Sequence, residues 1–220
     1  MIRTLEVGIL LKVVAGDLDR LIQNVLLYTN SKAVRLREVF FTLGSEKMYA
    51  FSCDDYIAVG DWIEVESTEV KEFSLSLQDL ERLAEWIKKD KKVIHKTEIE
   101  LKFYNTYFKA SADDDIEKFQ YMDETNYDAW DIVFDMLSED QPVRIIEEFA
   151  VRPDRFAKIA RLKADKEAPV VFRGIDINGH LLVQFKKGLS LVGVAMPIDV
   201  ERVQEEFRWK KTGPTEVSPS

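Results

Sequence analysis

The side chains best suited to chemistry in this sequence are lysines and arginines that gather on segments with helical periodicity. In the first cluster, the residues Arg152, Arg155, Lys158 and Arg161 recur at intervals of three and are followed by Lys163. The second cluster consists of Arg82, Lys88, Lys89, Lys91 and Lys92. Each lysine or arginine that neutralises a phosphate releases a condensed counterion, so several on one face give sequence-independent, salt-sensitive attachment to a nucleic-acid backbone. The alternative is a solvated helix face whose C-terminal lysines are favoured by the helix dipole.

Patterns for catalysis or metal binding are sparse. His95 and His180 are the only histidines, and neither has the spacing to Cys, Asp or Glu that a metal site needs. The run at 113–115 is three aspartates, which could bind a divalent cation, although adjacent carboxylates in a turn are more typical of a solvated loop. Glycine-rich phosphate loops and nucleophile elbows are absent from the sequence. We therefore expect a protein that is not an enzyme, with no catalytic residue, no metal and no cofactor.

Composition and charge indicate a globular protein with one large domain or two of ordinary size. The chain has 220 residues, 46% of them hydrophobic, and a formal net charge of −9. No apolar run approaches the length that spans a bilayer, and the N-terminus lacks the apolar stretch of a secretory signal. The single cysteine, Cys53, rules out an intramolecular disulfide and fits a small core residue. We expect a cytoplasmic protein with no membrane partner.

The elements that must position the cations form a unit that occurs three times, in which an amphipathic helix is followed by three short strands. In the first copy, apolar residues predict a helix over 18–26 that Asp17 would cap. Strands are then predicted to end near Phe41 and to cover 49–53 and 57–65. The alternative is three unrelated helix-and-strand segments that happen to share a pattern.

The second copy has the same order. A short strand around Phe73 precedes a helix that Ser76 opens with a capping-box-like start. Alternating apolar residues then predict strands at 99–103, 107–110 and 119–121.

In the third copy, a strand at 143–150 leads into a helix from about Pro153 to Leu162, with proline at the first helical position. The inward-facing residues of this helix would be Phe156, Ile159 and Ala160. A three-stranded meander is predicted at 170–198, because Asn178-Gly179 and Lys187-Gly188 are strong hairpin signals.

Between the second and third copies lies a segment, 124–141, that contains acidic residues but no lysine or arginine. Tyr127, Trp130, Phe134 and Leu137 recur at helical spacing, which predicts an amphipathic helix packed by its aromatic face. Its acidic side is either solvated or meets a basic surface, on a neighbouring subunit or on the protein's own basic helices. In the last case it would weaken contact with nucleic acid.

The repeated units, the basic helices on an acidic body and the final strand Val194-Ala195-Met196-Pro197-Ile198 resemble the bacterial DNA polymerase III beta sliding clamp family, whose chains also close on a Met-Pro strand. The resemblance implies an α+β, DNA-clamp-like fold. Residues 1–122 would form one complete clamp-like domain and 123–200 a second, incomplete or degenerate one. The tail at 201–220 is rich in Pro, Ser and Thr and is predicted to be partly disordered.

In that family, helices line a channel for duplex DNA and sheets form the outside of a ring. Both basic clusters would then hold the DNA backbone without reading its sequence. The family's groove for short peptide motifs of polymerases and repair proteins uses the C-terminal strand. The matching residues here are Val194, Met196, Pro197 and Ile198. Ordinary strand packing is the alternative interpretation of these four residues.

The resemblance implies a processivity factor for DNA replication, or a viral or mobile-element relative of one, that tethers a polymerase to duplex DNA. Bacterial clamps have three domains per chain and form dimers, whereas a chain with two domains would need a trimer to complete a six-domain ring. The alternative function is a monomeric clamp-like interaction protein that binds and modulates a replication or repair protein.

Overall fold

The structure is a computed structural model that describes residues 9–29, 37–67, 69–89, 97–122, 127–138, 140–145, 149–164 and 168–197. The predicted site residues Lys91, Lys92 and Ile198, and the tail at 201–220, lie outside these ranges. In chain order, the elements are β1 (Leu10–Val14), α1 (Ala15–Leu26), β2 (Val39–Leu43), β3 (Lys47–Cys53), β4 (Ile57–Glu64), β5 (Glu66–Ser67), β6 (Lys71–Leu75), α2 (Leu77–Lys88), β7 (Glu98–Phe103), β8 (Tyr107–Ala112), β9 (Asp115–Gln120), α3 (Tyr127–Leu137), β10 (Val143–Arg144), α4 (Pro153–Arg161), β11 (Val170–Ile177), β12 (His180–Lys187) and β13 (Leu191–Ala195).

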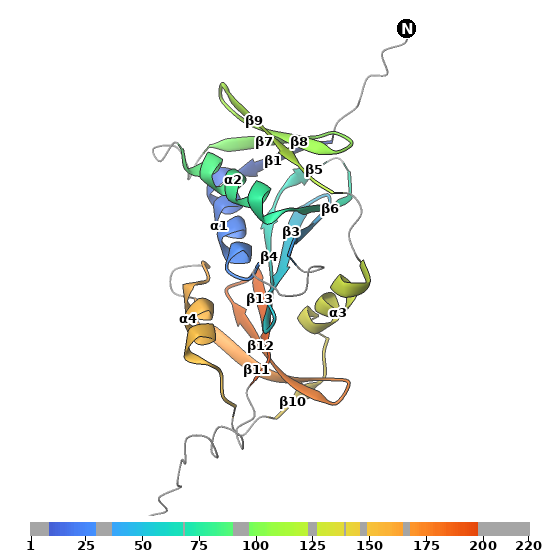
Figure 1. The fold of residues 1–220 in the computed structure, drawn as a ribbon, viewed down its shortest axis with the longest axis vertical. Coiled ribbons are helices and arrows are strands. Elements are labelled where there is room, and N and C mark those ends of the chain that lie inside the picture. The colour runs from blue at the N-terminus through green and yellow to red at the C-terminus, as the bar shows by residue number, and fades with distance from the viewer. Residues whose placement is uncertain are drawn as a thin grey trace, which may run out of the picture.

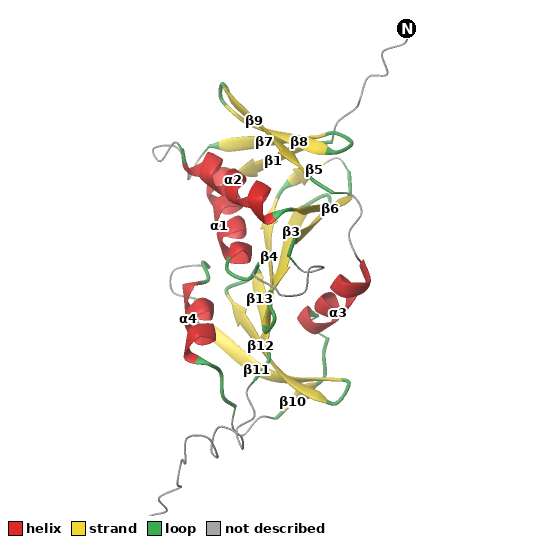
Figure 2. Ribbon diagram, viewed as in Figure 1, coloured by secondary structure: helices red, strands yellow, loops and turns green. Residues whose placement is uncertain are grey.

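The described strands form two antiparallel sheets, and the fold is α+β as predicted (Figure 2). One sheet has five strands in the order β5-β1-β7-β8-β9, and the other has eight in the order β10-β11-β12-β13-β4-β3-β2-β6. The eight-stranded sheet joins distant parts of the chain, because β13 pairs with β4 in a register that sets Val194 opposite Ala58. This sheet runs across residue 122, where the two predicted domains meet, and that division stays a prediction.

Helices lie on both sides of the eight-stranded sheet (Figure 1). α1, α2 and α4 are on one side and α3 is on the other. Strand alternation explains this, since Phe41 of β2 belongs to the core beneath α1 while its neighbour Phe40 packs against Trp130 of α3. We call the α3 side the outer face; its side chains include those of Phe40, Phe51, Ala58, Val192 and Val194. The acidic helix therefore does not lie against the protein's own basic helices, and that alternative is wrong.

The largest core lies under α1 and α2. Leu21, Ile22 and Val25 of α1 are completely buried, as the helical stripe predicted, and Leu80 and Leu83 of α2 join them. Burying one such side chain contributes about 1.5–3 kcal/mol, so the stripe is sufficient to hold α1 against the sheets.

The two helix starts in the first half of the chain differ from each other. At α2, the Ser76 hydroxyl accepts a hydrogen bond from the backbone N–H of Asp79 at 3.1 Å, which confirms the predicted cap. At α1, the helix begins at Ala15, and the N-cap position is Val14, with no side-chain cap. The predicted role of Asp17 as a cap is therefore wrong, because this residue already lies in the first turn, where a carboxylate is favoured by the helix dipole instead.

The third unit differs from its prediction at the leading strand and at the helix. β10 contains only Val143 and Arg144 of the strand predicted at 143–150, with Ala150 in an isolated bridge conformation. α4 starts at Pro153, as predicted, but Phe156 is 53% exposed and Ala160 is also exposed. The buried residues of this helix and its cap are Arg155, Ile159 and Leu162.

The hairpin of the third unit confirms its turn prediction. Asn178 and Gly179 adopt φ angles of 53° and 83°, the left-handed pair that a tight two-residue hairpin requires. They connect β11 to β12, which pair from Val170 opposite Lys187 to Ile177 opposite His180. Within the described part of the chain, none of the helices is long and apolar enough to cross a membrane.

Candidate nucleic-acid interface

The described cations of α2 are held by carboxylates. Arg82 donates to Asp79 Oδ1 and to Glu117 Oε1, both at 2.9 Å, and lies over the Phe119 ring. Lys89 is 3.8 Å from the second oxygen of the same Glu117. Lys88 lies 3.9 Å from Asp19, which belongs to α1. These three predicted DNA contacts are exposed, but each already has an anionic neighbour.

Two cations at α4 also have carboxylate partners. Arg152 pairs with Asp154 at 3.1 Å, and Lys158 donates to Asp54 at 2.9 Å. Arg161 is exposed at the end of the helix.

Asp19 brings the two basic clusters together. Its Oδ2 lies 3.3 Å from Lys163 Nζ, just after α4, and its Oδ1 lies 3.9 Å from Lys88 Nζ, at the end of α2. The cations that the sequence places far apart thus meet around one α1 carboxylate. DNA that binds this layer must compete with protein carboxylates for most of these cations, because screening and ion pairing reduce the local positive potential.

Arg155 is the exception to the predicted arrangement. Its side chain is only 9% exposed, with the guanidinium carbon 3.6 Å from the Tyr56 ring centre. Its Nη1 donates to the carbonyl oxygen of Met196 at 3.4 Å. The expectation that Arg155 lies on an exposed face with its neighbours is wrong. Residues spaced by three step back about 60° around a helix of 3.6 residues per turn, so four of them sweep half its circumference.

The residues predicted to bind a partner peptide are not equally accessible. Val194 is 3% exposed because α3 covers it, and it belongs to the same cluster as Trp130 and Leu137. Met196 is 50% exposed, and its N–H donates to the carbonyl of Tyr56 at 2.9 Å. Pro197 is half-buried. An open groove could therefore include Met196 and Pro197, while Val194 becomes available only if α3 moves.

A polar cluster that sequence reasoning missed joins α1 to β4 and to the segment after α4. Asp61 is completely buried on its side-chain atoms and accepts from Arg20 at 2.6 Å and from Asn24 at 2.8 Å. Asn24 also donates to the Lys163 carbonyl at 2.7 Å and accepts from the Lys163 N–H at 2.6 Å. The same Nη1 of Arg20 also donates to the Ser190 hydroxyl at 3.1 Å. The only sequence signal was a carboxylate at an inward position of a strand, Asp61 between Val59 and Ile63.

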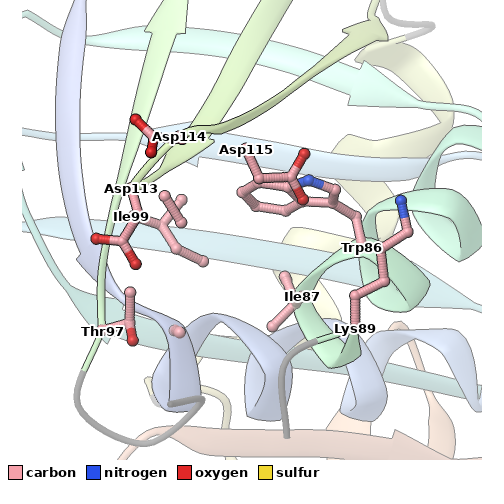
Figure 3. A pocket seen from close by; sticks show the side chains of 10 residues that line it. Trp86, Ile87, Lys89, Thr97, Ile99, Asp113, Asp114 and Asp115 are labelled. Carbon is pink, nitrogen blue, oxygen red and sulfur yellow. The ribbon is translucent and has the colours of Figure 1, made fainter. Parts of the chain in front are cut away.

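The aspartate turn forms one wall of a small cavity of about 180 Å³ between α2 and β7–β9 (Figure 3). Asp113, Asp114 and Asp115 are exposed, and the carboxylates of Asp113 and Asp115 lie on opposite sides of this pocket. Asp113 adopts a φ angle of 51°, which identifies the tip of the β8–β9 hairpin. Across the described ranges, no three His, Cys, Asp or Glu residues are grouped so as to hold a metal ion.

Comparison with solved structures identifies the architecture. The beta subunit of DNA polymerase III from Thermotoga maritima superposes with a TM-score of 0.62 and 15% identity, over 90% of this chain and 68% of that chain. A DNA polymerase III beta subunit from Eubacterium rectale, described as putative, gives a TM-score of 0.64 at 11% identity over 90% of this chain and 68% of that one. This chain has the sliding-clamp fold.

The likeness to sliding clamps is one of fold. A DNA polymerase sliding clamp from Pseudomonas aeruginosa matches with a TM-score of 0.61 at only 10% identity, over 87% of this chain and 66% of that one. The chain thus spans about two thirds of the length of these sliding-clamp structures. The sequence matches no protein-family model, and no curated protein is significantly similar to it.

Proposed function

We propose that this protein is a non-catalytic, clamp-like tether that holds a DNA polymerase on duplex DNA. The observation that carries the proposal is the shared layer of α1, α2 and α4, in which Asp19 brings Lys88 and Lys163 together on a sliding-clamp fold. Lysines and arginines in such a layer contact phosphates without reading bases, which is what a tether that slides requires. Such a protein works where DNA is replicated, in the cytoplasm.

Ring closure and partner binding follow from the same proposal. With two clamp-like domains per chain, three copies complete a six-domain ring by closed rotational symmetry. A polymerase or another replication protein docks a short peptide beside Met196 and Pro197, at the end of β13, together with Ile198.

A second function is favoured by the ion pairs. Arg82, Lys89 and Lys158 are each within 4 Å of a carboxylate in the described structure, which weakens the attraction of this layer for phosphate. A monomeric clamp-like protein that binds a replication or repair protein needs no strong DNA contact. The alternative function is therefore an interaction module that modulates such a partner.

Two measurements separate these functions. Sedimentation analysis at micromolar concentration gives a stable trimer for a ring and a monomer for an interaction module. Retention is then compared on nicked circular DNA and on the same DNA linearised, because a closed ring slides off free ends and a basic patch does not. Equal retention on both forms would remove the tethering mechanism.

A further inference from the structure

The outer face carries an apolar patch built from two distant parts of the chain. Strand register places Phe51 opposite Gly60 and Gly60 opposite Val192 in one row. In the next row, Ala58 lies between Cys53 and Val194. An uncovered patch of this kind on a folded protein is a binding surface, since apolar area exposed to water is costly.

In the structure, α3 covers this patch with aromatic side chains. The rings of Trp130 and Phe40 stack with their centres 5.8 Å apart, and Phe134 lies 5.1 Å from Phe40 and 4.9 Å, edge to face, from Phe51. Trp130, Val133 and Leu137 are buried against the sheet. The opposite side of the helix carries Asp131 and Asp135, which are exposed.

Within the described residues, few hydrogen bonds attach α3 to the sheet. Gln184 of β12 donates from Nε2 to the Ser138 carbonyl at 3.0 Å and to the Met136 carbonyl at 3.5 Å, at the C-terminal end of the helix. Its Oε1 accepts from Arg173 at 2.6 Å. If α3 leaves, water can take the place of those two carbonyls, so no buried donor stays unpaired. Apolar contacts hold α3 on the sheet, and another apolar segment can make the same contacts.

α3 leaves part of the outer face open. A groove of about 540 Å³ lies between Phe134 and Leu137 of the helix and the sheet residues Tyr49, Trp62 and Val192. Lys47 also lines this groove, with its ammonium 3.8 Å from the Trp62 ring centre. A second segment can therefore engage the outer face before α3 has left.

We propose that the outer face is a docking surface for acidic amphipathic segments with aromatic anchors, that α3 is its resident occupant, and that a partner segment of the same chemistry displaces α3. The charge of the partner is inferred from α3, whose solvent side is acidic, and from Lys47, which lines the groove. This proposal depends on the proposed function in one respect. Displacement of α3 would expose Val194, which is one of the residues expected to bind a partner peptide. A partner of this kind binds with an apparent affinity reduced by the small fraction of molecules in which α3 is undocked.

The sole cysteine of the chain reports directly on this exchange. Cys53 packs against the same cluster as α3, and burial, with Asp54 and Asp55 nearby, raises its thiol pKa to about 12. Alkylation needs the thiolate form of Cys53. Departure of α3 therefore speeds the reaction in two ways, because the sulfur becomes accessible to the reagent and the pKa of the thiol falls. The experiment compares alkylation rates at about pH 8 for the full-length protein, for Trp130→Ala and for the matched control Asp131→Asn on the solvent side.

The expected result is a rate at least about tenfold higher in Trp130→Ala and unchanged in Asp131→Asn. A synthetic peptide covering 127–138, added in trans, should bind Trp130→Ala at least about tenfold more tightly than the wild type and restore protection of Cys53. The same peptide with alanine in place of Trp130 and Phe134 should do neither.

Two outcomes would overturn the proposal. Equal alkylation rates in Trp130→Ala and wild type would mean that α3 does not cover the patch. In the second outcome, alkylation is faster, the far-ultraviolet circular dichroism signal of the folded protein is lost and the peptide gives no protection. That combination would mean that α3 is an integral core element. The variant Gln184→Ala, which removes the polar attachment of α3 together with the hydrogen bond from Arg173, then checks the result and should give an intermediate rate. No DNA or polymerase is present, so failure of the tethering function would leave this test unaffected.

Discussion

The guanidinium of Arg155 lies over the Tyr56 ring, with 3.6 Å between its central carbon and the ring centre, and this contact joins α4 to the turn before β4. The same side chain reaches the Met196 carbonyl, at the end of β13. Arg155 therefore connects three segments from the two halves of the chain.

Loss of this contact should destabilise the fold. Arg155→Ala and Tyr56→Leu should each lower the free energy of unfolding by about 1–2 kcal/mol, because a partly desolvated cation–π pair contributes on that scale. Arg161→Ala, on the exposed side of the same helix, should change it by less than about 0.5 kcal/mol. Urea denaturation of a double-mutant cycle measures the coupling. Additive effects of the two substitutions would show that the pair contributes nothing of its own.

Substitution of Asp61, whose carboxylate is buried, should lower the free energy of unfolding more than substitution of an exposed acidic residue. Asp61→Asn removes the negative charge that faces Arg20 and should lower the free energy of unfolding by about 3 kcal/mol, as when one partner of a buried ion pair is lost. Glu64→Gln, at an exposed position of the same strand, is the control. Thermal unfolding followed by circular dichroism measures both; similar midpoints would contradict a stabilising role for Asp61.

Salt dependence should separate exposed from buried cations. Arg161→Ala and Lys163→Ala should each reduce the slope of log affinity for duplex DNA against log salt by about 1, since under the proposed function each would remove one phosphate contact. Lys109→Ala, on the exposed side of β8, should leave the slope unchanged, as should Arg155→Ala in a sample checked for folding. Fluorescence anisotropy across a salt series measures the slopes. An equal loss from Lys109→Ala would locate the DNA elsewhere.

Cys53 should make stability fall at alkaline pH. Its thiol pKa is raised by burial to about 12 in the folded protein, so the unfolded chain releases the proton at a lower pH than the folded one. The stabilising contribution is complete below the unfolded pKa of about 8.5 and is lost as the pH rises toward the folded value. Between about pH 8 and pH 10 the wild type should lose about 1–2 kcal/mol more than Cys53→Ala. Parallel pH profiles for the two proteins would contradict this assignment.

Features that depend on neighbouring residues could be predicted from the sequence. The stripe of α1, the Ser76 cap of α2 and the Asn178-Gly179 hairpin each follow from spacing over a few positions, and the structure has all three. The α+β sliding-clamp fold also followed, because the order of these local units is characteristic even at 10–15% identity.

Features that depend on packing between distant segments could not be predicted from the sequence. Helical periodicity shows that α3 has an apolar side but not which face of a sheet receives it. The burial of Arg155 depends on Tyr56, and the Asn24 amide depends on the Lys163 backbone; in both cases the partner is far away in sequence. The proposed DNA contacts stay predictions for the same reason, since their ion-pair partners come mostly from other elements.

The pairing of β4 with β13 has a consequence for synthesis of the chain. Residues 57–60 pair with residues 192–195, so this edge of β4 has no partner until residues 192–195 have left the ribosome. An unpaired strand edge is a template for pairing with other chains. The nascent protein is therefore exposed to aggregation while the segment between β4 and β13 is being synthesised, and a truncation before Leu191 would make that exposure permanent.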